Sequence, residues 1–223
     1  FLVLTITPAA TVNAGSDQTI CSTTASINLT GSFGGGATFS TWSTTGTGTF
    51  GDVANPVTTY APSAADAALG SVTLRLTTSN PAGPCPAVND AMVLTINPVP
   101  VVSAGADQTV CSTSNVSLTG TRSGGATSTT WTTSGTGSFA NATALITTYT
   151  PGAADISAGT VTLTITSNEP AGPCNAVSDA MIVTINPAAT ANAGPDQSIC
   201  ATATATLAGS VGGGAASGSW SGG

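Results

Sequence analysis

The sequence predicts an all-β protein built from tandem β-sandwich modules of about 90 residues. Three observations predict this. Landmarks recur along the chain: Trp42, Trp131 and Trp220 are each 89 residues apart. Apolar and polar residues alternate in short runs rich in Val, Ile and Thr, which is typical of half-buried strands. Clusters of Gly, Pro, Asn and Ser separate these runs, and no window shows a helical stripe.

The repeat divides the chain into four parts. Residues 1–8 are predicted to be the last strand of a preceding module, or a strand donated to a neighbouring chain. Residues 9–98 and 99–187 are two whole modules, and residues 188–223 are the first third of another. This division favours an excerpt from a longer, processed protein over strand donation.

Within the first module, the strands follow the order of an immunoglobulin-like sandwich. We expect strands at 17–20, 26–32, 38–43, 71–78 and 90–97, with an irregular region at 47–60. Trp42 is predicted to fill the core, as are Trp131, Trp220, Tyr60 and Tyr149. The segment after each tyrosine is expected to form a short helical turn, capped by Asp66 or Asp155 and ended by Gly70 or Gly159. The Gly clusters at 34–36, 124–125 and 212–214 are interpreted as flexible turns.

The composition excludes several functions. The 223 residues contain 2 basic and 9 acidic side chains, no His and no Lys. Without His there is no Ser-His-Asp triad, and without Lys there is no Walker-type phosphate loop. A net charge of −7 argues against nucleic-acid binding, which requires a basic face. The chain is therefore not expected to be an enzyme or to hold a cofactor, and no apolar run is long enough to span a membrane.

The repeated acidic residues do not predict a metal site. Asp17, Asp107 and Asp196 occupy one repeat position, where a turn residue that bonds its own backbone is favoured over a calcium ligand. Asp90 and Asp179 are interpreted as solvated or turn residues. No two acids lie close enough in sequence to support a glycosidase-type pair.

The motifs resemble those of a known type of repeat. The run Ala-Gly-Pro-Asp-Gln-Ser-Ile at 193–199 resembles that of PKD-like and related immunoglobulin-like modules. The fuller repeat pattern has a Cys after this run and then a Trp. It continues with Tyr-Thr-Pro-Gly-Ala-Ala-Asp, as at 149–155, and Gly-Pro-Cys, as at 172–174. Such tandem repeats occur in very large secreted or surface proteins of Bacteroidota-type bacteria. The Trp-Asp-Phe-Gly-Asp-Gly signature of ordinary PKD modules is absent, so this is a divergent variant. The resemblance implies stalks of adhesins or appendages, often exported by the type IX system.

Five cysteines, Cys21, Cys85, Cys111, Cys174 and Cys200, predict disulfides and an oxidising, extracellular setting. A bond within one module would join Cys21 to Cys85, or Cys111 to Cys174. However, Cys21 lies in the turn between the predicted strands 17–20 and 26–32, and Cys85 lies in the loop between 71–78 and 90–97. These positions are at opposite ends of a strand about 30 Å long. A head-to-tail array instead brings Cys21 near Cys174, so this inter-module bond is favoured. Free buried thiols remain an alternative to disulfides, and a zinc site is a weaker alternative.

The sequence thus predicts a structural protein, a stalk, fibre or filament stiffened by disulfides, whose partners are copies of itself or neighbouring modules. The alternative is an adhesin module that binds a glycan or protein through its loops. Weakly charged strand edges would also allow lateral assembly. Asn28, Asn115 and Asn141 begin N-glycan sequons, and Asn28 and Asn115 are interpreted as equivalent. Glycans on Ser or Thr are a further candidate coat.

Overall fold

The computed structural model describes residues 1–4, 6–81, 85–169 and 172–221. The chain forms two compact units. Unit 1 contains Phe1–Val101, Ser123–Thr127 and Glu169–Ala176, and unit 2 contains Val102–Arg122, Ser128–Asn168 and Val177–Gly223. The two short segments in unit 1 come from the second sequence repeat, so the units do not follow the repeat boundary strictly.

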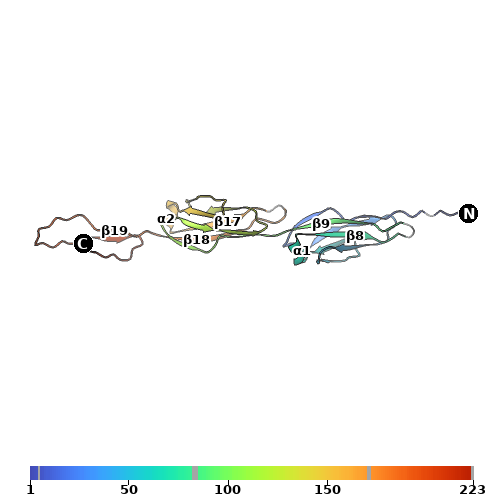
Figure 1. Ribbon diagram of the computed structural model, residues 1–223, viewed down its shortest axis with the longest axis horizontal. Helices are drawn as coiled ribbons and strands as arrows, with labels where there is room; N and C mark the ends of the chain where they lie inside the picture. Colours follow the sequence, from blue (N-terminus) through green and yellow to red (C-terminus); the bar gives the residue numbers. More distant parts are fainter. Residues whose placement is uncertain (5, 82–84, 170–171, 222–223) are drawn as a thin grey trace. The chain divides into compact units, whose positions relative to one another are not determined.

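Unit 1 is a β-sandwich. One sheet has the order β2-β9-β8-β5, where β2 and β9 are parallel and the other neighbours are antiparallel. The facing sheet has the order β3-β7-β6, and β1 pairs with β4. The bounds are β1 (Thr11–Asn13), β2 (Gln18–Cys21), β3 (Ile27–Thr30), β4 (Ser32–Gly34), β5 (Ser40–Thr44), β6 (Thr49–Phe50), β7 (Val57–Ala61), α1 (Ala64–Leu69), β8 (Ser71–Thr78) and β9 (Asn89–Asn97). Figure 1 shows β8 and β9 side by side.

Unit 2 repeats this architecture, with sheets β11-β18-β17-β14 and β12-β16-β15. Two further ladders pair β10 with β13 and β19 with β20. The bounds are β10 (Pro100–Ser103), β11 (Gln108–Cys111), β12 (Val116–Thr119), β13 (Thr121–Gly124), β14 (Thr129–Thr133), β15 (Ser138–Phe139), β16 (Ile146–Thr150), α2 (Ala153–Ala158), β17 (Thr160–Ser167), β18 (Ser178–Asn186), β19 (Thr190–Asn192) and β20 (Ser210–Gly212). The predicted all-β, immunoglobulin-like sandwich fold is confirmed.

The core of each unit lies between its two sheets, and the period-two pattern places it there. In β8, Val72, Leu74 and Leu76 are buried while the residues between them are not. Trp42 and Tyr60 lie in the unit 1 core, and Trp131 and Tyr149 lie in the unit 2 core. Each tryptophan indole donates a hydrogen bond to a backbone carbonyl, that of Pro56 or Ala144, at 3.2 Å.

Trp220 does not follow this pattern. The prediction that it fills a core is wrong, because its side chain is 55% exposed. Among the described residues after Asn186, only β19 and β20 form a ladder, and no second sheet lies over the indole. The described residues at 1–8 are in no strand, and the side chains of Phe1 to Leu4 are exposed.

The acidic residues before β2 and at the start of β9 bond backbone groups that are distant in sequence. Asp17 does not bond its own turn: its carboxylate accepts the N–H of Val93 in β9 at 2.8 Å. Asp90, interpreted as a solvated or turn residue, accepts the N–H of Ala14 at 2.8 Å. The carboxylates therefore satisfy backbone donors where the chain crosses from β1 to β2, and Asp107 and Asp179 do the same in unit 2.

The described residues include no helix that could cross a membrane, since α1 and α2 have six residues each.

Candidate functional site

The candidate site is a covalent clamp that joins the two sequence repeats. Cys21, at the end of β2, forms a disulfide with Cys174, in the loop between β17 and β18. The Cα atoms are 5.1 Å apart, and both side chains are almost fully buried. Both cysteines belong to unit 1, because Glu169–Ala176 packs there. The pairing is the inter-module one that the loop positions favour, and the structure contains neither alternative within one module.

The loop reaches β2 through a close backbone approach. The Cys174 sulfur lies 3.5 Å from the carbonyl oxygen of Asn97, the last residue of β9. Gly172 has φ +114, and a Cβ there would meet the Asn97 amide and, at 3.2 Å, a methyl group of Thr19. Glycine at this position therefore lets the loop pack against β2 and β9.

The linker between the repeats is held from two sides. The Ser22 hydroxyl accepts the N–H of Val99 at 3.3 Å, and the Ser22 N–H donates to Asn97 at 2.9 Å. On the other side, Gly125 donates its N–H to the Val99 carbonyl at 3.2 Å. Gly124 has φ +63, and a Cβ there would overlap that carbonyl. This Gly cluster forms the expected turn, and it also packs against the linker.

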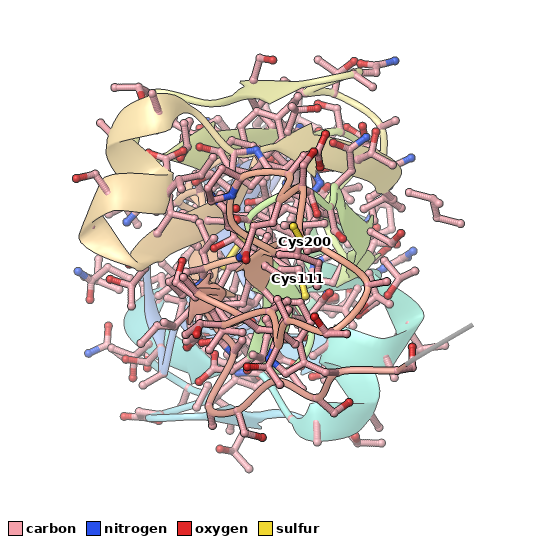
Figure 2. The ribbon with its side chains drawn as sticks, turned by 90° about the vertical axis from the view of Figure 1, so that its left-hand side faces the viewer. Cys111 and Cys200 are labelled. Carbon is pink, nitrogen blue, oxygen red and sulfur yellow. A yellow bond between two sulfur atoms is a disulfide. The ribbon has the colours of Figure 1, made fainter. Side chains whose placement is uncertain are left out.

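The remaining cysteines are unpaired in the part of the chain that the structure describes. Cys85 is half-buried, and Cys111 and Cys200 are exposed. Figure 2 labels Cys111 and Cys200, whose sulfurs are not joined. The Cys85 sulfur lies 3.5 Å from the carbonyl oxygen of Thr7, which matches the contact between Cys174 and Asn97.

A buried tyrosine–carboxylate pair fixes the turn before β8. Asp66 is fully buried, and its carboxylate accepts the Tyr60 hydroxyl at 2.7 Å. It also accepts the N–H groups of Thr47, Gly48 and Ser63 at 2.7, 3.0 and 3.1 Å. In return the Ser63 hydroxyl caps α1, and Gly70 ends it with φ +77. The predicted cap is present, but the tyrosine partner was missed, although Tyr and Asp recur six residues apart in both repeats.

The surroundings of this pair favour an ionised Asp66 and a neutral Tyr60. Burial raises the pKa of Asp66, but the hydrogen bonds from Thr47, Tyr60 and Ser63 outweigh it and leave the pKa below its usual value. Burial and the neighbouring carboxylate raise the pKa of Tyr60. Unit 2 repeats the arrangement, with the pKa of Asp155 lowered and that of Tyr149 raised. Each carboxylate accepts four hydrogen bonds, which hold the turn before β8 or β17 in place.

The sequon asparagines are exposed, but they are not equivalent to one another. Asn28 lies opposite Thr59 in the β3–β7 ladder, and Ser117 holds the same place opposite Thr148 in unit 2. Asn115 precedes β12, so the interpretation of Asn28 and Asn115 as equivalent is wrong. The Asn141 side chain accepts the N–H and hydroxyl of Thr143, both at 2.9 Å.

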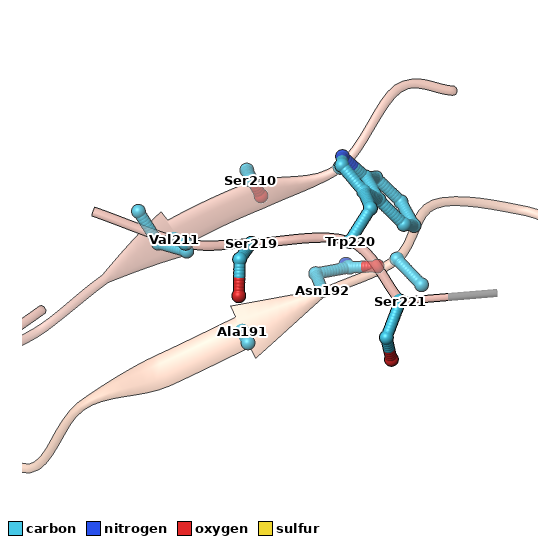
Figure 3. A pocket seen from close by; sticks show the side chains of 10 residues that line it. Ala191, Asn192, Ser210, Val211, Ser219, Trp220 and Ser221 are labelled. Carbon is cyan, nitrogen blue, oxygen red and sulfur yellow. The ribbon is translucent and has the colours of Figure 1, made fainter. Parts of the chain in front are cut away.

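A hollow of about 400 Å³ lies beside Trp220 and is lined by β19, β20 and residues 218–221. Figure 3 shows the indole over Asn192 and Ser221 at one end of this hollow. A Cβ on Gly209 would meet this indole, just as one on Gly31 or Gly120 would meet Trp42 or Trp131. Trp220 therefore holds the same place relative to Gly209 that Trp42 and Trp131 hold relative to Gly31 and Gly120. Across the described ranges, no three acidic or cysteine side chains gather to hold a metal ion.

No known protein family matches the sequence, and no curated protein is similar to it. The fold is similar to that of mouse cadherin-23 EC22-24, with 10% identity and a TM-score of 0.44 over 81% of this chain and 68% of that one. Human CDH23 EC21-23 has 14% identity and a TM-score of 0.47 over 79% and 64%. The insect immune protein hemolin has 10% identity and a TM-score of 0.49 over 80% and 47%. At these identities the likeness concerns the fold alone.

Proposed function

We propose that the chain is a structural segment of an extracellular array, a stalk, fibre or filament, in which disulfides tie successive repeats together. The single observation that carries the proposal is the bond between Cys21 and Cys174, which come from different repeats. A buried disulfide of this kind persists in oxidising compartments, which supports an extracellular location. The saturated Asp66 and Asp155 support a role other than catalysis.

The PKD-like character and the type IX export route belong to the same proposal and rest on the sequence resemblance. A glycan coat belongs to it too, supported by the exposed Asn28, Asn115 and Asn141. The binding alternative would use the loops of the modules. However, the loop that carries Cys174 is already packed against its own chain, which favours the structural role.

The clamp changes the path of a mechanical load. When the two ends are pulled, tension passes from residue 21 through the sulfur–sulfur bond to residue 174. Residues 22–173, which include most of both cores, then form a closed loop that carries no direct tension. The disulfide therefore shields residues 22–173 from extension, whereas β2 and β18, which lie outside this closed loop, stay in the path of the load.

Single-molecule force spectroscopy tests this. The bond separates residues 153 apart in sequence, so its reduction should add about 500 Å of contour length when the cores unfold. We expect the oxidised chain to extend only through residues 1–21 and 174–223, and the reduced chain to show the long extension.

Matched variants make the result specific. Cys174→Ser should give the long extension without reductant, whereas Cys200→Ser, at an unpaired cysteine, should behave like the oxidised parent. Long extension of the oxidised parent would contradict the proposal, because both cores would then lie in the path of the load.

A further inference from the structure

The strands β3 and β12 lie at the ends of their sheets. In the orders β3-β7-β6 and β12-β16-β15, each has a neighbouring strand on one side alone among the described residues. β1 and β10 pair with the segments that follow, β4 and β13. The chain then crosses to the opposite sheet, where the N–H groups of Ala14 and Ala104 bond to Asp90 and Asp179. This crossing leaves one edge of β3 and of β12 open to a further strand.

A glutamine from the facing sheet covers one carbonyl on each open edge. Gln18 is the first residue of β2, and its side-chain amide donates a hydrogen bond to the carbonyl oxygen of Asn28 in β3 at 3.2 Å. Gln108 is the first residue of β11, and its amide donates to the carbonyl oxygen of Ser117 in β12 at 2.9 Å. Both repeats therefore bond the two sheets at the same point.

The covered carbonyl is one that an added strand would use. Successive residues of an antiparallel strand direct their backbone groups alternately to one side and to the other. The Ser117 carbonyl accepts Gln108 and so faces away from β16, as do the backbone groups of Thr119 two residues later. A side-chain amide carries the same kinds of donor and acceptor as a peptide group. The Gln108 side chain therefore takes the place of one peptide group of an added strand.

The open edges lack the charges that commonly keep strands of separate molecules apart. Neither β3 nor β12 contains a charged residue. The chain has no Lys, and its two Arg residues lie on other strands, Arg75 on β8 and Arg122 on β13. The glutamine bond recurs one repeat further along, where Gln197 donates to the carbonyl oxygen of Thr206 at 2.6 Å. The amide is thus the repeated feature at this edge, and charge is not.

We propose that Gln18 and Gln108 close the edges of β3 and β12 against a second copy of this chain, which would otherwise add there as a further strand. The partner of each edge is the same edge of the other copy, because two identical edges related by a two-fold axis run antiparallel and match donors with acceptors. Such a contact would join two three-stranded sheets side by side. The proposal goes beyond the function proposed above, since neither strand contains a cysteine of the clamp.

Replacement of the glutamines by alanine tests the closure. The three unpaired thiols are first alkylated, so that sedimentation velocity measures non-covalent association alone. We expect Gln108→Ala to dimerise through β12 and Gln18→Ala to dimerise through β3. Each association constant should exceed that of the parent chain by about tenfold or more, because the freed carbonyl regains a hydrogen bond from the second copy. The double variant has two open edges and should form larger oligomers.

The variant Gln108→Glu separates closure of the edge from stability of the fold. An ionised carboxylate has nearly the same size as the amide, but it cannot donate to the Ser117 carbonyl and it places a charge at the edge. Gln108→Ala and Gln108→Glu should both unfold at a lower urea concentration than the parent, yet only Gln108→Ala should dimerise. Equal dimerisation of the two would show that association follows from lost stability, and the proposal would be wrong.

Hydrogen exchange locates the contact. In Gln108→Ala, the amides of Ser117 and Thr119 should exchange more slowly as the dimer forms, because they then donate to the second copy. A monomeric Gln108→Ala, or slower exchange confined to other strands, would overturn the proposal. The Cys21–Cys174 peptide in a digest of the same samples reports separately on the clamp, so the failure of one proposal is distinguishable from that of the other.

Discussion

Asp66 and Asp155 are the residues on which the turns before β8 and β17 depend. Each buried carboxylate accepts three backbone N–H groups and a tyrosine hydroxyl, so it organises two loops and a strand at once. Asp66→Asn replaces one oxygen with an amide group that faces these donors. We expect the free energy of unfolding to fall by about 3 kcal/mol, measured by urea titration.

Asp52 offers a matched control for this substitution. It is exposed, and its carboxylate accepts the N–H of Ala54 at 2.9 Å in a local turn. Asp52→Asn should change the free energy of unfolding by less than about 0.5 kcal/mol. Equal effects at the two sites would show that the buried network is not what stabilises the turn.

The same residues predict how stability depends on pH. The pKa values of Asp66 and Asp155 are lowered in the fold, so their contribution is complete above the unfolded value of about 4 and is lost as pH falls through the folded values. The pKa values of Tyr60 and Tyr149 are raised, so their contribution is complete below about 10 and is lost as pH rises further.

Thermal melts should therefore show a plateau of Tm between about pH 5 and 9, with a fall on each side. The double variant Asp66→Asn, Asp155→Asn should have a flatter acid limb, because the two titrating groups are gone. An unchanged acid limb in that variant would assign the acid sensitivity to other carboxyl groups.

At the scale of elements, local patterns predicted the strands, but not the bonds between distant ones. Leu74 and Leu94 are buried because they lie on the inward face of alternating runs, which a short window of sequence reveals. Asp17 was misread because its partner, Val93, is 76 residues away and depends on the register of β2 and β9. The clamp was inferable because loop positions exclude pairing within one module, whereas the packing of Gly124 on the linker has no signal in composition.

Gly124 allows the strength of that linker contact to be measured. Gly124→Ala introduces both a strained φ of +63 and an overlap with the Val99 carbonyl. Gly105→Ala introduces the strained φ alone, since no atom lies within 4 Å of a Cβ there. We expect losses of about 3 and about 1 kcal/mol in the free energy of unfolding. Equal losses in chemical denaturation would show that the linker moves aside without cost.

At the scale of the whole molecule, the scarcity of charge acquires a structural meaning. A chain with 11 charged residues out of 223 has few side chains that keep strand edges and apolar patches apart. Covalent ties suit such a surface better than they suit an isolated, soluble monomer. The disulfide ties a loop of the second sequence repeat covalently to β2 of the first.

The last prediction concerns the energy that this bond contributes. Closing a loop between residues 153 apart restricts the unfolded chain, and the loop-entropy relation gives about 5 kcal/mol for this length. Because the loop contains most of both cores, the constraint acts on the state in which both units are unfolded. The total free energy of unfolding, summed over all transitions in guanidinium, should therefore fall by about this amount in Cys21→Ser, Cys174→Ser. The double variant Cys85→Ser, Cys200→Ser retains the Cys21–Cys174 bond and should match the parent chain when both are measured as oxidised monomers. A loss confined to a few tenths of a kcal/mol would mean that the bond orders the loop around Cys174 without constraining the unfolded chain.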